Sequence, residues 1–303
     1  MKNVSVIIPA FNAASYLESA VDSLLRQTFP PREIIVVDDG SQDGTAGVCR
    51  ELGDTVRLES IENGGVARAR NIGAKQATGD YFVFLDADDV LLPHALESLH
   101  RQMEESSAGF VYGMVIERRP PPLRPKLSGF DFIAGDPPLP AKRNFWRSAV
   151  VTPGSAMVRA ELHRRLGGFV TGFEPLEDRD YWVKCGLLEP VGYCDTVVLD
   201  KSWHPSSHGS QHAKRIFRGQ LAQRHLREWC HGAGIDSSWI PADPEILRRA
   251  LDEALWRREY GIIKPLRKLG AASGLRHWKS AIVAAISNAS EPDWIHVEPR
   301  VMS

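Results

Sequence analysis

The chain has 303 residues, enough for one large domain or two ordinary ones. Hydrophobic residues make up 43% and charged residues 25%, which excludes a wholly disordered chain. The formal net charge of −1, from 37 basic and 38 acidic residues, argues against a nucleic-acid-binding protein.

Cysteine spacing and hydropathy indicate the compartment. Cys49, Cys185, Cys194 and Cys230 are widely separated, which predicts neither a disulfide framework nor a zinc ribbon. The apolar run Val4–Ile8 is too short for a signal peptide. No stretch reaches the ~18 to 20 apolar residues of a membrane span. We therefore expect a protein of the reducing cytoplasm.

Short apolar runs alternate with amphipathic helical patterns over the first 116 residues. The predicted strands are Val4–Ile8, Ile34–Val37, Val56–Ile61, Tyr81–Leu85 and Phe110–Ile116. The predicted helices are Leu17–Leu25, preceded by a capping-box pattern of Ser15 and Glu18, then Val66–Ala77 and Pro93–Glu105. Short strands alternating with helices predict βαβ units and a parallel sheet in an α/β fold.

The remainder of the chain divides at a proline-rich run and again near residue 211. The run from Arg118 to Pro125 predicts a loop or a boundary, because proline cannot continue a helix or a central strand. Residues 126–205 have weaker periodicity, and the chain becomes helical and basic from about residue 211. We expect one domain over 1–210, with halves of about 1–116 and 117–210, followed by a helical region over 211–303.

Acidic residues follow two of the predicted strands directly. Asp38 and Asp39 come after Ile34–Val37, whereas Asp86, Asp88 and Asp89 come after Tyr81–Leu85. Ligands bind outside the carboxyl ends of strands in open α/β sheets. A divalent cation would offset the repulsion among such carboxylates. The alternative is ordinary turn chemistry, in which aspartate and glycine are common.

Four ordered motifs resemble the family 2 glycosyltransferases of the GT-A fold. The motifs are residues 4–12, residues 37–41 with 43–45, residues 63–66 with 69–71, and residues 79–89. The resemblance covers roughly residues 1–205. It implies a Rossmann-like, mostly parallel sheet flanked by helices, with a nucleotide-binding half at about 1–116 and an acceptor and catalytic half at about 117–210. It also implies transfer of a sugar from a nucleotide diphosphate donor, with inversion at the anomeric carbon.

The resemblance assigns the donor-binding residues position by position. The loop that lines the nucleotide matches Pro9, Ala10, Phe11 and Asn12. Asp39 matches the acid that binds the base, with help from Asp38. Arg70, with Arg68 as the alternative, matches a basic residue near the nucleotide. Asp86 matches the acid on the ribose or sugar side, and Asp88 matches the metal ligand.

The family places its catalytic base in a Glu-Asp pair at the start of a helix. Glu177 and Asp178 fit this pair, with Glu177 on the nucleotide-sugar side and Asp178 as the base. Asp180 is the alternative base. On spacing alone, Glu177 and Asp178 could simply complement the dipole of the helix.

A histidine segment follows, where relatives carry a residue that helps bind metal or diphosphate. His204 is the candidate and His208 the alternative, with an Mn²⁺ or Mg²⁺ cofactor. Ser202 stands where relatives commonly carry an arginine, so this position supplies no positive charge and Lys201 is the alternative source of it. The other interpretations are a loop histidine that binds no ligand and a zinc site formed by Cys185, Cys194, His204 and His208.

The lack of membrane spans, and of the signature of processive members, predicts transfer of a single sugar in polysaccharide biosynthesis. The acceptor would be a hydroxyl of a glycan or of a lipid-linked molecule. The basic residues of the helical region could rest on an anionic membrane surface, or they could form a solvated face of a packed helix. The competing functions are a sugar-nucleotide nucleotidyltransferase, a dehydrogenase and an inactive sugar-binding relative. The dehydrogenase lacks support because no G-x-G-x-x-G follows the first strand.

Overall fold

The computed structural model describes residues 2–119, 124–129, 134–137, 151–202, 212–240, 248, 250–254, 261 and 263–268. The described residues up to 171 and from 177 to 202 form one compact unit. Residues 172–176 and the described residues from 212 onward form a second unit. The chain therefore leaves the first unit for five residues and returns to it at residue 177.

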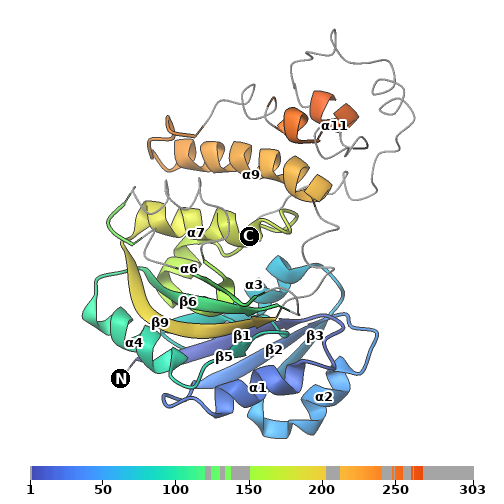
Figure 1. The fold of residues 1–303 in the computed structure, drawn as a ribbon, viewed down its shortest axis with the longest axis vertical. Coiled ribbons are helices and arrows are strands. Elements are labelled where there is room, and N and C mark those ends of the chain that lie inside the picture. The colour runs from blue at the N-terminus through green and yellow to red at the C-terminus, as the bar shows by residue number, and fades with distance from the viewer. Residues whose placement is uncertain are drawn as a thin grey trace. The chain divides into compact units, whose positions relative to one another are not determined.

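A mixed sheet is the centre of the first unit (Figure 1). Over the described residues its strands are β1 (Val4–Ala10), β2 (Glu33–Asp39), β3 (Arg57–Ile61), β4 (Tyr81–Phe84), β5 (Val90–Leu91), β6 (Phe110–Arg118), β7 (Lys126–Ser128), β8 (Ala156–Arg159) and β9 (Val191–Ser202). Their order in the sheet is β3-β2-β1-β4-β8-β6-β9-β5, and β7 pairs with β6.

The helices flank this sheet or belong to the second unit. They are α1 (Leu17–Leu25), α2 (Thr45–Glu51), α3 (Val66–Gln76), α4 (Ala95–Glu105), α6 (Ala160–Leu166), α7 (Glu177–Leu188), α9 (His212–Gly232) and α11 (Ile263–Lys268). Two 3₁₀ turns, Gly53–Thr55 and Pro153–Ser155, complete the described elements.

The first four strands are parallel, as their alternation with helices predicts. β1 pairs with β2 and β4, and β2 pairs with β3, all in parallel register. Strands β1, β2 and β4 are almost wholly buried, as expected for strands with helices on both faces. The α/β architecture with a helical C-terminal region is thereby confirmed.

The second half of the sheet is mixed rather than parallel. β8 runs antiparallel to both β4 and β6 and lies between them, whereas β6 and β9 are parallel. The weak periodicity of residues 126–205 did not indicate β8 or β9. The proline-rich run follows the end of β6 at Arg118, and β7 then pairs back onto β6.

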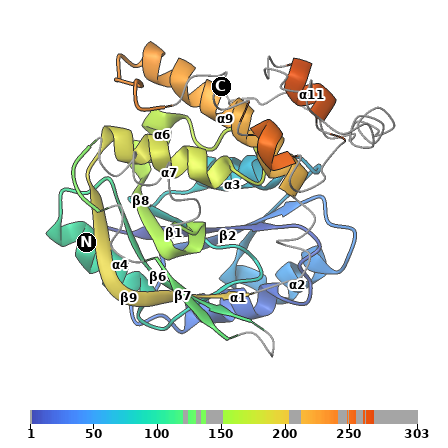
Figure 2. The same ribbon diagram turned by 45° about the horizontal axis from the view of Figure 1, so that its top comes forward.

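Helices cover both faces of the sheet (Figure 2), and a cluster of buried hydrophobic side chains lies on each face. Successive strand residues point to opposite faces, so Val6 and Ile8 join the layer of α1 and α4, while Ile7 joins the layer of α3, α6 and α7. This two-sided burial holds the strand ends in a fixed arrangement. The loops that follow those ends therefore stand on a rigid support.

The start of α1 differs from the predicted capping box. Tyr16 is the N-cap residue, and no side chain caps the helix. Instead, the backbone N–H groups of Tyr16 and Leu17 donate to the carbonyl of Ala13 at 2.9 and 3.0 Å. The turn through Ala13 thus starts the helix, and Ser15 and Glu18 do not act as a capping pair.

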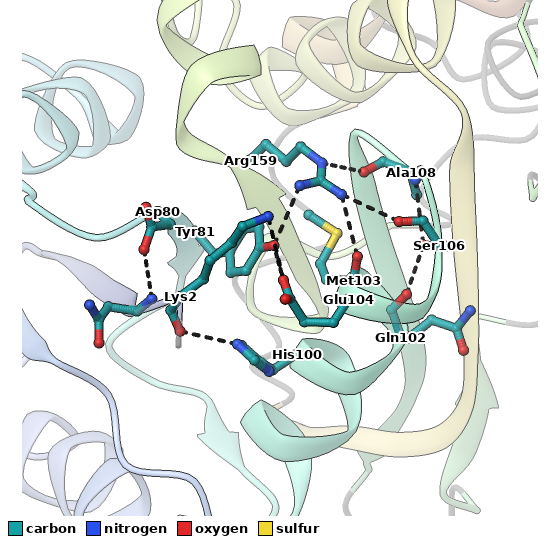
Figure 3. Close-up of polar contacts among 11 residues, drawn as sticks. Lys2, Asp80, Tyr81, His100, Gln102, Met103, Glu104, Ser106, Ala108 and Arg159 are labelled. Carbon is teal, nitrogen blue, oxygen red and sulfur yellow. Dashed lines mark hydrogen bonds and ion pairs between the residues drawn. The ribbon is translucent and has the colours of Figure 1, made fainter.

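A polar network closes the amino edge of the parallel strands (Figure 3). Arg159 donates to the carbonyls of Ala108 and Met103 at 2.7 and 3.3 Å, and the hydroxyl of Tyr81 donates to Glu104. A cation at carbonyls that follow a helix is favourable. The network therefore ties the end of α4 to β4 and β8.

The second unit contains α9 and α11. Arg218 of α9 donates to the backbone carbonyl of Glu174 at 2.8 Å and forms an ion pair with the Glu174 carboxylate at 3.4 Å. Among the described residues, no helix combines the length and the apolar character needed to cross a bilayer.

Candidate active site

The two acidic clusters lie at the same edge of the sheet, on either side of β1. Asp38 is in register with Ala10, the last residue of β1. On the other side, the N–H of Leu85 donates to the carbonyl of Ile7 at 2.9 Å, and Asp86 follows directly. The order β2-β1-β4 therefore places the end of β1 between Asp38 and Asp86. The strand-end argument from the sequence correctly predicts this shared edge.

The loop after β1 is fastened to the loop after β2. The N–H of Asn12 donates to the hydroxyl of Ser41, and the N–H of Gln42 donates to the side-chain oxygen of Asn12, both at 2.9 Å. Asn12 has a φ of 50°, a region in which asparagine is tolerated better than most residues. Pro9 and Ala10 are buried within β1, whereas Phe11 is 52% exposed. An exposed aromatic ring at a strand end offers a stacking surface for a planar ligand.

Asp38 and Asp39 organise the turns around them. The Asp38 carboxylate accepts the N–H of Ser41 at 3.0 Å. The two oxygens of Asp39 accept the N–H groups of Gly64 and Gly65, each at 2.8 Å. Burial raises the pKa of Asp39, and the two N–H groups partly offset this effect. Asp39 therefore connects the end of β2 to the glycine-rich turn that starts α3.

Arg70 joins the donor half to the start of α7. Its guanidinium donates to Asp86 at 2.7 Å and to Glu177 at 2.9 Å, and its side chain is only 3% exposed. A planar guanidinium suits two carboxylates at once. The predicted residues Arg70, Asp86 and Glu177, which lie far apart in the sequence, are thus in direct contact.

Asp178 lies next to this bridge. It is half-buried, and its carboxylate accepts the N–H of Arg179 at 2.6 Å. Burial raises the pKa of Asp178, whereas the positive charges of Arg70 and Lys201 act against the rise and Asp86 adds to it. A carboxyl group with a raised pKa is suited to accept a proton near neutral pH.

Asp180, the alternative base, has a different environment. Its side chain is 2% exposed and forms an ion pair with Lys184 at 2.5 Å, one turn further along α7. A carboxylate that is buried and paired in this way is less accessible to an acceptor hydroxyl than Asp178, which is half-buried. We therefore prefer Asp178.

Asp88, Asp89 and Lys201 complete the charged cluster. Burial and the nearby Asp86 raise the pKa of Asp89 to about 8, and its carboxylate accepts the N–H of Ser202 at 2.9 Å. Burial works against the charged form of Lys201, yet the carboxylates of Asp89, Asp86, Asp178 and Asp88 together raise its pKa. From the sequence, Asp89 was identified only as part of an acidic run. Its contact with Ser202 could not be predicted, because the two residues are 113 positions apart in the sequence.

The residues that could hold a divalent cation are acidic. Among the described residues, no three His, Cys, Asp or Glu side chains form a metal-binding group by themselves. However, Asp86 and Asp88 offer hard oxygen ligands at the strand end, and one buried oxygen of Asp89 has no hydrogen-bond partner. Mg²⁺ commonly binds through one or two carboxylates together with substrate phosphates. These oxygen ligands therefore fit a divalent cation whose remaining coordination positions are filled by a diphosphate.

Two predicted positions fall outside the described residues. These are His204 and His208. Cys185 and Cys194, the cysteines of the alternative zinc site, are buried and form no disulfide.

A cleft of about 320 Å³ lies elsewhere, at the amino edge of the sheet. Lys2, Tyr81, Arg159 and Glu161 are among its lining residues. Arg159 and Tyr81 also belong to the network in Figure 3, which accounts for their polar groups structurally. We therefore place the site at the carboxyl edge.

Comparison with known proteins identifies the family. The family model of glycosyl transferase family 2 matches residues 5–167. The chain belongs to this family. An uncharacterized glycosyltransferase from Rickettsia felis is 30% identical over 220 residues, which cover 69% of this chain and 35% of the relative. The glycosyltransferase GlyG of Streptococcus pneumoniae is 38% identical over 114 residues, 36% of this chain and 38% of that protein.

The chain spans only about a third of the length of these curated relatives. Solved structures show the same GT-A fold. S. aureus TarS in complex with UDP has a TM-score of 0.62 at 21% identity, covering 86% of this chain and 74% of that one. The mannosyltransferase PcManGT from Pyrobaculum calidifontis, in complex with GDP-Man and Mn²⁺, has a TM-score of 0.54 at 21% identity and covers 94% of this chain and 86% of that one.

Proposed function

We propose that this glycosyltransferase moves a single sugar, with inversion, from a nucleotide diphosphate sugar to a hydroxyl of a glycan or lipid-linked acceptor. The observation that carries the proposal is the Arg70 bridge, which brings Asp86 of the donor half to Glu177 and thereby beside Asp178. UDP and GDP-Man in the complexes of TarS and PcManGT support a nucleotide sugar as the donor.

The residues divide the work between donor and acceptor. Phe11 and Asn12 would line the nucleotide together with Pro9 and Ala10, Asp39 and Asp38 would face the base, and Asp86 the ribose or sugar. Asp178 takes the proton of the acceptor hydroxyl while that oxygen bonds to the anomeric carbon. The bond from the anomeric carbon to the diphosphate oxygen breaks, and the nucleoside diphosphate leaves with that electron pair.

Positive charge must balance the leaving diphosphate. Asp88, with His204 from outside the described residues, would hold Mn²⁺ or Mg²⁺, which supplies such charge when bound. Lys201 adds a cation from the protein itself, since four carboxylates favour its charged form. We expect the enzyme to be cytoplasmic, with the basic helical region as the candidate for any peripheral contact with a membrane.

The donor can be identified by a thermal-shift screen against uridine, guanosine and thymidine diphosphates, each with and without Mn²⁺. A ligand at 100 times its Kd stabilises the fold by about 2.7 kcal/mol, so the correct diphosphate should raise Tm by several degrees. No shift with any of the three would contradict the proposed donor class.

The base is tested by Asp178→Asn in an assay of nucleoside diphosphate release. Because general base catalysis contributes roughly 10²–10⁴-fold, kcat should fall by that factor while donor binding is retained. Asp195→Asn, the same change at an exposed position of β9, is the control and should keep full activity. Unchanged release by Asp178→Asn would remove the assignment. Donor binding without release in the unmodified protein would favour an inactive sugar-binding relative.

A further inference from the structure

We propose that Asn71, Gly168 and Phe169 form a positioning clamp that holds α7, and with it the base, against the donor half of the site. The inference rests on the proposed function, in which Asp178 is the base. None of the three residues acts on the substrate in this proposal. They act through α7.

The clamp begins with a two-way hydrogen bond between a side chain and a backbone. The Asn71 amide donates to the carbonyl of Phe169 and accepts the N–H of Phe169, both at 2.8 Å. Asn71 is 8% exposed, so water cannot easily replace either bond. An amide side chain donates through its nitrogen and accepts through its oxygen. A hydroxyl has a single oxygen for both roles, and an ionised carboxylate can only accept.

Gly168 makes this close approach possible. Its φ is +81°, and a Cβ on it would lie 2.4 Å from the side-chain oxygen of Asn71. Only glycine satisfies both the conformation and the space. The clamp therefore needs matching residues on two segments that are nearly 100 positions apart in the sequence.

Phe169 connects the clamp to α7. Its ring stacks on the ring of Tyr181 with centroids 4.1 Å apart and an interplanar angle of 24°. Tyr181 is three residues after Asp178 on α7, so both side chains project from the same part of the helix. Fixing Phe169 therefore restrains the face of α7 that carries Asp178 and Tyr181.

Arg70, the neighbour of Asn71 on α3, makes a second set of contacts that restrains α7. Its guanidinium lies 5.3 Å from the centre of the Phe169 ring and binds Glu177, the first residue of α7. Two consecutive residues of α3 thus contact α7 and the segment before it: Asn71 binds Phe169, and Arg70 binds Glu177 in the first turn of α7. Because a 1 Å misplacement of a catalytic group can cost roughly 10²-fold in rate, this grip should affect kcat.

The test compares Asn71→Ala and Gly168→Ala with Ser5→Ala in the full chain. Ser5 is a matched control, since it is fully buried and makes two hydrogen bonds at the start of β1, away from the carboxyl edge. Each clamp variant should lower kcat by roughly 10–100-fold. The Kd for nucleoside diphosphate, measured by calorimetry, should change less than about threefold, because Asp39 and the β1 loop are untouched.

Two outcomes separate the clamp from a general structural role. The double variant should be no slower than either single variant, because both remove the same hold. Hydrogen exchange over residues 177–188 should accelerate in Asn71→Ala and not in Ser5→Ala. A wild-type kcat in Asn71→Ala, equal losses in Ser5→Ala, or unchanged exchange in α7 would overturn the clamp. If the unmodified protein releases no nucleoside diphosphate, the proposed function fails, yet hydrogen exchange still tests the clamp.

Discussion

His163 shows how one buried residue makes stability depend on pH. It is 6% exposed, and its Nδ1 lies 2.8 Å from the hydroxyl of Tyr181. Burial lowers the pKa of His163 to about 4, with help from the charge of Arg164. The neutral ring therefore favours the folded state, and this contribution is complete above pH 6.5 and is lost as the pH falls towards 4.

We predict that His163→Gln removes this pH dependence. From pH 7.5 to 4 the free energy of unfolding of the unmodified protein should fall by up to roughly 3 kcal/mol more than that of the variant, as the pKa shift implies. Urea unfolding at both pH values measures the difference. Parallel losses in the two proteins would show that His163 does not carry the effect.

Lys201 should tune the base. The pH profile of kcat/KM should fall on the acid side as Asp178 becomes protonated. Because the charge of Lys201 acts against the rise in the pKa of Asp178, Lys201→Met should move this acid limb to higher pH. Lys201→Arg keeps the charge and should leave the limb in place. A limb that shifts equally in both variants would assign the effect to lost packing.

Among individual residues, the sequence predicted those that directly follow the end of a strand. Asp38, Asp39, Asp86 and Asp88 are such residues. Asn71 appeared only as part of a motif, because its role depends on a backbone partner 98 positions away. No local pattern encodes such a contact.

Among the elements, α3 packs closely on the sheet through Gly73. A Cβ there would lie 2.4 Å from a methyl group of Ile7 and 3.1 Å from one of Val37. We predict that Gly73→Ala lowers the free energy of unfolding by about 1–3 kcal/mol, as overpacked cores do. The control is Gly47→Ala in α2, where a Cβ meets nothing within 4 Å, so helix propensity should stabilise the fold by up to about 1 kcal/mol. Opposite signs in urea unfolding are expected, and a stabilising Gly73→Ala would contradict the close packing.

Elements with strong periodicity were predictable, and elements without it were not. β1, β2 and β4 follow from short apolar runs, because both of their faces are buried. β9 mixes buried, partly exposed and exposed positions over 12 residues without a regular alternation, and it bears register shifts against β6, so its sequence has no clear strand pattern. β8 has only four residues, and its place between β4 and β6 depends on long-range pairing.

On the scale of the whole molecule, Arg218 holds residues 172–176 within the second unit through the carbonyl and carboxylate of Glu174. We predict that Arg218→Ala speeds hydrogen exchange over 172–176 while β1 and β4 keep their protection. His231→Ala, at an exposed position of the same helix, is the control and should change neither. Equal exchange in both variants would show that Arg218 does not restrain this segment.

The residue after this borrowed segment is Glu177, the first residue of α7. The segment 172–176, which α9 contacts through Arg218, is therefore joined covalently to the first turn of α7, where we assign Asp178 as the base. Strain on α9, for example when a bulky acceptor engages it, would reach this turn through the non-covalent contacts of Arg218 with Glu174 and then through the few peptide bonds between Glu174 and Asp178.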